Sequence, residues 1–363
     1  MADFVAGVAE ALTDARTLPL AAVAERMSIL QQLVADAETT EVLLIPLSGE
    51  AVDRWQRLAA QRDEVWAFVR GTDGGTVLAT DEPSELGQRM LADAVIYPEI
   101  HTRLVAWWLI HAWRVVDLFD DTLTSLVQWR ITVAPVTARA LLEEVGCLLY
   151  EARQIEQVWT KAKALKESPL GRPERVRSTL APVLADASFG SRLEAFAEKA
   201  KAVNVLTYIR KLAKATGDDR VNKWYDWLSD AAHPALGARI AMSSSPAMHE
   251  TKAVTLRCYA RRPVFVQAGK SVGTDFTIAH MATDALIACG TIGADLLEQT
   301  LRIVDDFGLT TQAAALTRRW YWRDFTPVRG ARACPCGRGK WSHCGHRWGE
   351  AAPTLSVPQT AAQ

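Results

Sequence analysis

Apolar residues recur every three or four positions through most of the chain from residue 97 onward. This spacing predicts a series of helices over about 97–118, 135–165, 191–215, 219–232, 275–306 and 310–323. Pro135 stands where the first turn of a helix tolerates proline, and Asp275 is a suitable N-cap for the long segment after it. The pattern therefore predicts a mainly α protein in which residues 96–325 form a multi-helix bundle.

One segment departs from the helical spacing. Near 253–268, the apolar runs Val254–Ala260 and Pro263–Val266 flank Arg261 and Arg262, as two strands flank a turn. We therefore expect a small β-hairpin inserted into the bundle.

The two ends of the chain follow other patterns. Residues 1–95 are predicted to form a small N-terminal helical unit, with helices over about 20–37 and 51–70, a short strand at 41–45 and a glycine-rich turn at 71–75. Residues 351–363 are small and polar and contain two prolines, so we expect them to be disordered.

Composition narrows the class of protein. Hydrophobic residues make up 49% and charged residues 23% of the sequence, which is typical of a globular protein rather than a disordered one. The most apolar stretch, 104–116, is interrupted by His111 and Arg114 and is too short to cross a bilayer, and the N-terminus does not resemble a secretory signal. We therefore expect a cytoplasmic protein without membrane association. His111 lies among tryptophans and is expected to be a core histidine rather than a metal ligand.

Three of the six cysteines lie close together near the C-terminus. They form the pattern Cys334-x-Cys336-x7-Cys344-x-His346, and three thiolates with one imidazole are a ligand set that Zn²⁺ prefers in a closed tetrahedral site. We therefore predict a zinc knuckle over residues 330–350. Because so short a segment cannot bury a core, its folding is expected to depend on the metal.

The same residues resemble the SEC-C motif, the zinc knuckle at the C-terminus of the preprotein translocase ATPase SecA. The stretch Cys334-Pro-Cys-Gly-Arg-Gly-Lys matches the opening of that motif apart from Arg338, which replaces a serine. The third cysteine arrives one residue early, so Gly345 separates it from the fourth ligand. His346 keeps the overall spacing, and His343 is the other candidate. The resemblance implies a structural Zn²⁺ and an adaptor that docks to a protein or ribonucleoprotein partner.

Charge is distributed unevenly along the chain. Residues 317–348 contain eight basic residues and one acidic residue, although the whole chain has a net charge of −1. Aromatic residues lie among these cations, a combination that holds single-stranded nucleic acid. The candidate RNA or partner contacts are Arg318, Arg319, Trp322, Arg323, Arg338, Lys340 and Trp341. The same residues also fit a helix end whose tryptophans pack on the body while its arginines face water.

A weaker signal lies in the helical body. Arg139 and Glu143 are four positions apart on an otherwise apolar helix, so we expect an ion pair between them, which His233 could join from a neighbouring helix. Such residues form either a polar network that holds helices in register or a small polar pocket.

Residues 97–235 also resemble HEPN-like bacterial proteins, which include RNA-cleaving toxins and defence nucleases. The Arg-x4–6-His motif of HEPN ribonucleases is missing before His233. A divergent HEPN-like nuclease or toxin is therefore the alternative to the adaptor, with Arg139, Glu143 and His233 as candidate catalytic residues. The sequence leaves open the oligomeric state and whether the protein is an enzyme.

Overall fold

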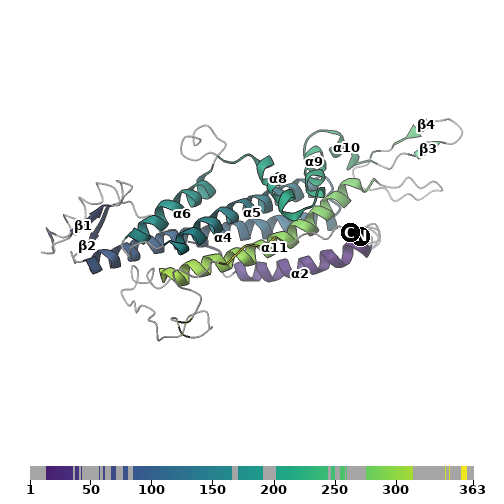
Figure 1. The fold of residues 1–363 in the computed structure, drawn as a ribbon. Coiled ribbons are helices and arrows are strands. Elements are labelled where there is room, and N and C mark those ends of the chain that lie inside the picture. Colours follow the sequence, from purple (N-terminus) through teal and green to yellow (C-terminus); the bar gives the residue numbers. More distant parts are fainter. Residues whose placement is uncertain are drawn as a thin grey trace.

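Three long helices form the centre of the molecule. The computed structural model describes residues 14–35, 37–40, 42, 57, 60–61, 67–70, 77–80, 85–165, 171–190, 202–243, 247–249, 254–257, 259, 275–313, 340, 343 and 353–357. Helices α4 (Glu85–Val127), α5 (Ala134–Ala164) and α11 (Thr277–Thr311) lie side by side along the long axis of the molecule (Figure 1). The prediction of a mainly α protein is confirmed.

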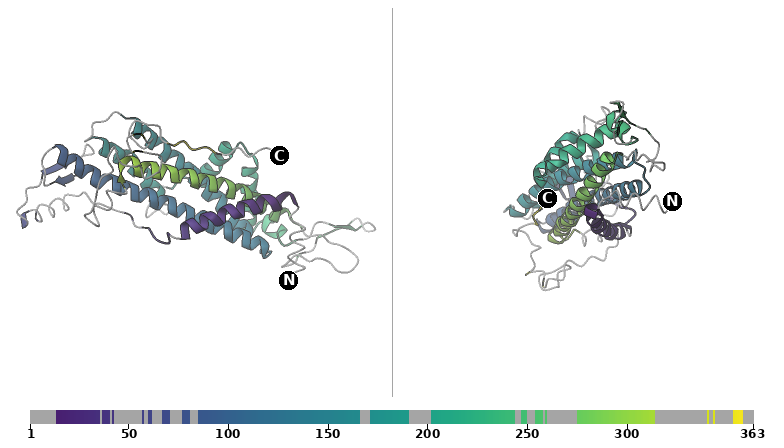
Figure 2. Two further views of the ribbon diagram at one scale, coloured as in Figure 1. Left: turned by 90° about the horizontal axis from the view of Figure 1, so that it is seen from below. Right: turned by 90° about the vertical axis from the view of Figure 1, so that its right-hand side faces the viewer.

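The shorter helices surround this centre. Helix α2 (Asp14–Ala35) packs on α11 and α4, and α6 (Gly171–Phe189) packs on α4 and α5. Helices α8 (Val205–Thr216), α9 (Arg220–Ala232) and α10 (Leu236–Ile240) gather at one end of the bundle (Figures 1 and 2). None of the described helices is both long enough and apolar enough to span a membrane.

The core lies where the apolar faces of the long helices meet. Leu141, Leu142, Leu148 and Leu149 of α5 have no exposed surface, and Phe307 of α11 is equally buried. Complete burial of one such side chain contributes roughly 1.5–3 kcal/mol relative to leaving it in water. The helical spacing of these leucines therefore explains why α5 lies at the centre of the bundle.

Two helices begin and end close to the positions that the apolar spacing predicts, whereas the bounds of other helices differ from the prediction. Helices α5 and α9 agree with the predicted 135–165 and 219–232 to within one residue at each end. Helix α4 begins well before residue 97, because it continues through Pro98 instead of starting there. The prediction contained no helix over α6.

Helix α11 also continues past its predicted end. We placed a break between 306 and 310, but α11 is unbroken to Thr311. Gly308 lies where α11 meets α4, and a Cβ atom at this position would lie 2.6 Å from Nε2 of His101. Gly308 therefore permits close contact between two helices within an unbroken α11.

Two short hairpins lie outside the bundle core. Strand β1 (Ala67–Arg70) pairs antiparallel with β2 (Val77–Thr80), so the predicted helix over 51–70 is wrong at its end. Pairing with β2 overrides the helical spacing over 67–70.

The second hairpin lies near the predicted one. Strand β4 (Val254–Leu256) falls within the first predicted strand, but it pairs with the preceding strand β3 (Ala247–His249). Residues 263–266 lie outside the described residues, so a hairpin across Arg261 and Arg262 stays a prediction.

Helix α2 packs in the bundle although it falls within the predicted N-terminal unit 1–95. Val23, Met27 and Leu30 are buried in the same hydrophobic core as α4 and α11. Arg16 pairs with Asp284 of α11 at 2.6 Å. The division of the chain near residue 95 stays a prediction, but α2 itself belongs to the packing of the bundle.

Five residues of the tail 351–363, which is predicted to be disordered, lie against the bundle. The expectation for the rest of the tail stays a prediction. Residues 353–357 run extended against α5 and α11, and Leu355 and Val357 pack on the core. The main chain of this segment is hydrogen-bonded to Glu156 and Gln299. Composition could not reveal these partners, because both lie far away in the sequence.

Gly290 of α11 should tolerate no side chain. A Cβ atom there would lie 2.5 Å from Cγ1 of Val23 and 2.7 Å from Cε2 of Phe119. Gly290→Ala is therefore expected to lower the free energy of unfolding by about 1–3 kcal/mol, because both neighbours must move. Urea denaturation measures this loss.

Gly293→Ala, one turn further along α11, is the matched control. Its Cβ would lie 3.2 Å from Cγ1 of Val115, a milder approach, and the gain in helix propensity of about 1 kcal/mol offsets it. Equal losses of unfolding free energy in Gly290→Ala and Gly293→Ala would contradict the close packing of Val23 and Phe119 on Gly290.

Candidate functional site

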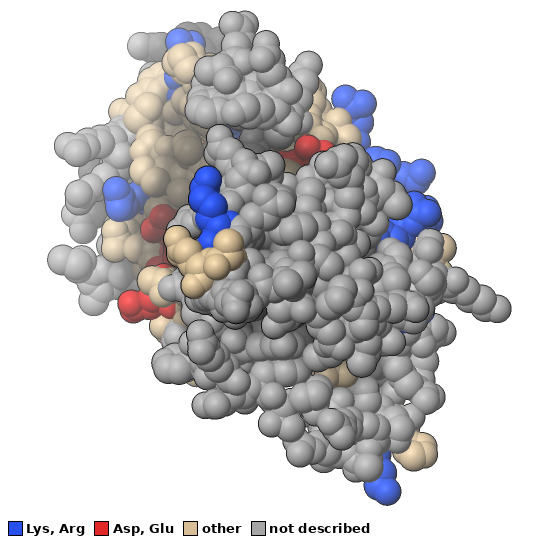
Figure 3. All heavy atoms as spheres, turned by 90° about the vertical axis from the view of Figure 1, so that its left-hand side faces the viewer, with Lys and Arg blue, Asp and Glu red and all other residues tan. Residues whose placement is uncertain are grey.

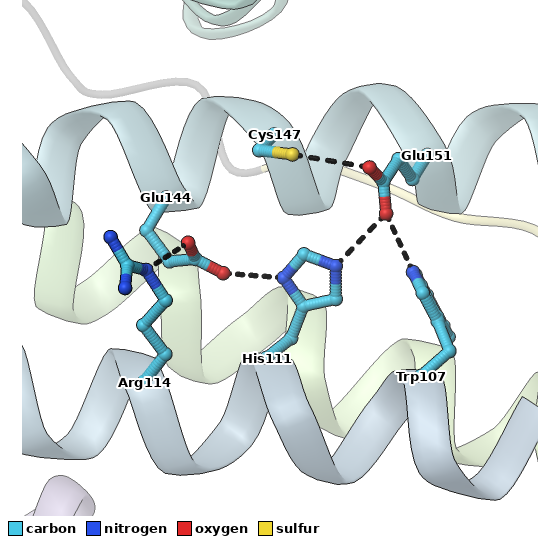
Figure 4. Close-up of polar contacts among 6 residues, drawn as sticks. All are labelled: Trp107, His111, Arg114, Glu144, Cys147 and Glu151. Carbon is cyan, nitrogen blue, oxygen red and sulfur yellow. Dashed lines mark hydrogen bonds and ion pairs between the residues drawn. The ribbon is translucent and has the colours of Figure 1, made fainter. Parts of the chain in front are cut away.

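A cluster of six side chains joined by polar contacts, here called the His111 cluster, lies between α4 and α5 (Figure 4). Trp107, His111 and Arg114 follow one another at helical spacing on α4, and Glu144, Cys147 and Glu151 do so on α5. Because each set lies on one face of its helix, the packing of α4 on α5 brings the six side chains together.

His111 is clamped between two carboxylates. Its Nδ1 lies 2.5 Å from Oε1 of Glu144, and its Nε2 lies 3.0 Å from Oε2 of Glu151. A carboxylate accepts hydrogen bonds, so a ring with a carboxylate at each nitrogen donates from both and carries a positive charge. Burial lowers the pKa of His111, but the hydrogen bonds and charges of Glu144 and Glu151 outweigh burial and raise this pKa to about 9.

Each carboxylate has further donors. Arg114 Nε donates to Oε2 of Glu144 at 2.7 Å, and Trp107 Nε1 donates to Oε2 of Glu151 at 2.7 Å. The thiol of Cys147 donates to Oε1 of Glu151 at 3.2 Å. Two cations thus face two anions, which is the condition under which buried charges are tolerated.

The thiol of the His111 cluster is not activated. Burial raises the pKa of Cys147, and the charge of Glu151 raises it further. Burial likewise raises the pKa of the neighbouring Tyr208. A thiol that keeps its proton is a poor nucleophile, and a protonated histidine cannot act as a base near neutral pH. The geometry therefore suits the alignment of α4 and α5 rather than general-base or nucleophilic chemistry.

A second buried ion pair joins α5 to α11. Nζ of Lys163 lies 3.0 Å and 3.1 Å from the two carboxylate oxygens of Asp306, and Nε1 of Trp159 donates to Oδ2 of Asp306 at 2.7 Å. The side chains of Lys163 and Asp306 are almost completely buried. Because removal of one partner would leave an unpaired buried charge, this pair fixes how the two helices align.

The three candidate catalytic residues, Arg139, Glu143 and His233, are not among the six side chains around His111. Nε of Arg139 lies 2.9 Å from Oε1 of Glu143, so the predicted ion pair is present. The guanidinium of Arg139 also lies 5.4 Å from the centre of the Tyr225 ring on α9. His233 is exposed at the end of α9, and no hydrogen bond or ion pair among the described interactions joins it to Arg139 or Glu143.

The predicted zinc ligands and most of the predicted basic contacts fall outside the described residues. These residues are Cys334, Cys336, Cys344, His346, Arg318, Arg319, Trp322, Arg323, Arg338 and Trp341. Lys340 and His343 are described and exposed, and the N–H of His343 donates to the carbonyl of Lys340 at 2.9 Å. Within the part of the chain that the structure covers, no group of three or more His, Cys, Asp or Glu residues could hold a metal ion.

The sequence located His111 but not its partners. Its expected place in the core is confirmed, since it is 7% exposed. The signal for its partners is Glu144 and Glu151, seven positions apart among the leucines of α5, because charged residues on a buried face need a counter-charge. Which helix supplies that counter-charge depends on tertiary packing.

Comparison with models of protein families, with curated proteins and with solved structures found no match to this chain.

The histidine clamp predicts a loss of stability as pH rises above 6.5. The folded protein keeps the proton of His111 up to about pH 9, whereas the unfolded chain releases it near pH 6.5. The free energy of unfolding should therefore fall by about 1.5–2 kcal/mol between pH 6.5 and 8, a range in which ordinary cysteine thiols are still mostly protonated. Urea denaturation at several pH values measures this slope.

Two variants test whether His111 causes this fall in stability. His111→Gln should be less stable than the wild type at pH 6.5, and its free energy of unfolding should stay constant between pH 6.5 and 8. His101→Gln is the control, because burial lowers the pKa of His101 to about 4, so that residue costs stability only below pH 6.5. An unchanged alkaline slope in His111→Gln would show that the proton is held elsewhere.

Proposed function

We propose that this chain is a zinc-dependent adaptor, in which a helical bundle carries a C-terminal zinc knuckle that docks to a protein or ribonucleoprotein partner. The observation that carries this proposal is the order Cys334-Pro-Cys-Gly-Arg-Gly-Lys, followed by Cys344 and His346. Its chemistry and its resemblance to the SEC-C motif both point to metal-dependent docking.

The donor set fits a structural zinc ion. Cys334, Cys336 and Cys344 would supply three thiolates, and His346 an imidazole, with His343 as the other candidate for the fourth position. Four protein ligands leave no coordination position for a substrate or a water molecule. Bound zinc would supply the folding free energy of this segment, roughly 10–16 kcal/mol in comparable small zinc peptides near neutral pH.

The bundle offers a suitable support for such a knuckle. Helix α11 carries the chain as far as Thr311, and residues 353–357 lie again on α5 and α11. The stretch with the cysteines therefore connects two segments that both lie on the bundle. Figure 3 views the molecule from the end at which α11 terminates, where described Lys and Arg side chains appear at several places. Asp and Glu side chains appear on the same face, so it is the basic residues between 317 and 348 that favour an acidic or phosphate-bearing partner.

A HEPN-like nuclease has less support. Arg139 is engaged by Glu143 and Tyr225, and His233 is exposed at the end of α9. RNA cleavage by the purified protein that disappears in His233→Ala would favour this alternative over the adaptor.

The first test of the adaptor is its metal content. The purified chain should contain one equivalent of zinc by elemental analysis, and Cys336→Ser should lose most of it, because three ligands bind zinc far more weakly than four. Cys147→Ser is the matched control, because Cys147 is a partly buried thiol on α5, and this variant should leave the zinc content unchanged. Loss of zinc in the control, or none in the purified chain, would refute the knuckle.

The second test is partner capture. The tagged full chain and Cys147→Ser should recover the same protein or ribonucleoprotein from lysate, and Cys336→Ser should recover at least about tenfold less, because the docking surface depends on the metal. Treatment with ribonuclease separates a protein partner from one held through RNA. Equal recovery by all three chains would show that docking does not require the knuckle.

A further inference from the structure

The extended segment 353–357 presents one face to the bundle. Pro353, Leu355 and Val357 are half-buried, whereas Thr354 and Ser356 are exposed. This alternation is the period-two pattern of a strand with one covered face. Leu355 and Val357 pack against the hydrophobic core. The bundle therefore distinguishes the two faces of the segment.

The polar contacts of this segment are made mainly by its main chain. The side-chain amide of Gln299 on α11 binds both sides of Ser356, because Nε2 donates to the Ser356 carbonyl at 2.8 Å and Oε1 accepts from the Ser356 N–H. The hydroxyl of Ser356 also lies 3.3 Å from this Oε1. On α5, Oε1 of Glu156 accepts from the N–H of Leu355 at 3.1 Å.

These contacts form a pattern that serves peptide recognition. Main-chain hydrogen bonds hold an extended peptide whatever its sequence, and sites for alternate side chains supply specificity. A helix surface has no free main-chain groups for this purpose, because they are bonded within the helix. The carboxamide of Gln299 and the carboxylate of Glu156 take the place of a strand edge.

We propose that the surface of α5 and α11 around Glu156 and Gln299 is a peptide-binding site. It binds an extended segment with apolar side chains two residues apart, and residues 353–357 occupy it in cis. A partner peptide of the same pattern would have to displace this segment and would release the C-terminal side of the stretch that carries the cysteines. This inference does not depend on the zinc knuckle.

A free peptide has to compete with residues 353–357, which already occupy the site. A segment on the same chain competes at an effective concentration on the order of millimolar for a short connection. The wild-type chain should therefore exclude a free copy of its own segment, and a chain whose segment no longer fits should accept one.

The experiment uses the full chain and a labelled peptide of residues 352–359. In the release variant, Leu355→Asp with Val357→Asp, the charged side chains cannot pack on the core. Fluorescence anisotropy, with protein added up to about millimolar, should show saturable binding of the peptide to this variant and at least about tenfold weaker binding to the wild type. Absence of binding to the release variant would overturn the proposal.

Two further substitutions in the release variant test the clamp. Gln299→Leu keeps the approximate size of the side chain but removes its hydrogen bonds to Ser356, so it should weaken peptide binding at least about tenfold. Glu298→Gln is the matched control, because Glu298 is adjacent on α11 and pairs with Arg26 of α2 instead. Equal binding by both variants would overturn the role of Gln299. Circular dichroism checks that all variants keep their helices.

Hydrogen exchange measures how firmly residues 353–357 occupy the site in the intact chain. The amides of Leu355 and Ser356 should exchange at least about tenfold faster in Gln299→Leu than in the wild type, and Glu298→Gln and Cys336→Ser should leave their rates unchanged. Fast exchange of these amides in the wild type would contradict the occupied site.

Discussion

The pairing of buried charges is the constraint on which the arrangement of the long helices depends. The clamp of His111 by Glu144 and Glu151 fixes α4 against α5, and the Lys163–Asp306 pair fixes α5 against α11. A slide of one helix along its neighbour would leave a buried charge without a partner, which costs several kcal/mol. Leucine packing alone tolerates more than one alignment, because apolar contacts are not directional. The charge pairs thus select one arrangement of the bundle.

A bundle fixed in this way suits an adaptor. The thiol of Cys147 keeps its proton, and His111 holds its own up to about pH 9, so the polar core contributes alignment rather than reactive groups. The chemistry that points to function lies instead in the sequence beyond α11. Because residues 353–357 rest again on α5 and α11, the bundle holds the far side of that stretch as well.

The sequence predicted what depends on local spacing and missed what depends on tertiary contact. Apolar periodicity predicted α5 and α9 closely, because each buries one face of a regular helix. The same rule failed at 67–70, where pairing with a second strand decides the conformation. The partners of His111 lie on another helix, and Gln299 lies 57 positions from Ser356, so neither contact has a local signature. The cysteine pattern is local, which is why the sequence alone could predict a metal ligand set.

The measurement that tests the central claim most directly is X-ray absorption at the zinc edge of the purified full chain. The account predicts one zinc ion with three sulfur ligands at about 2.3 Å and one nitrogen ligand at about 2.0–2.1 Å. A first shell without sulfur, or with oxygen from water in place of a fourth protein ligand, would contradict a closed structural knuckle and with it the proposed basis of docking.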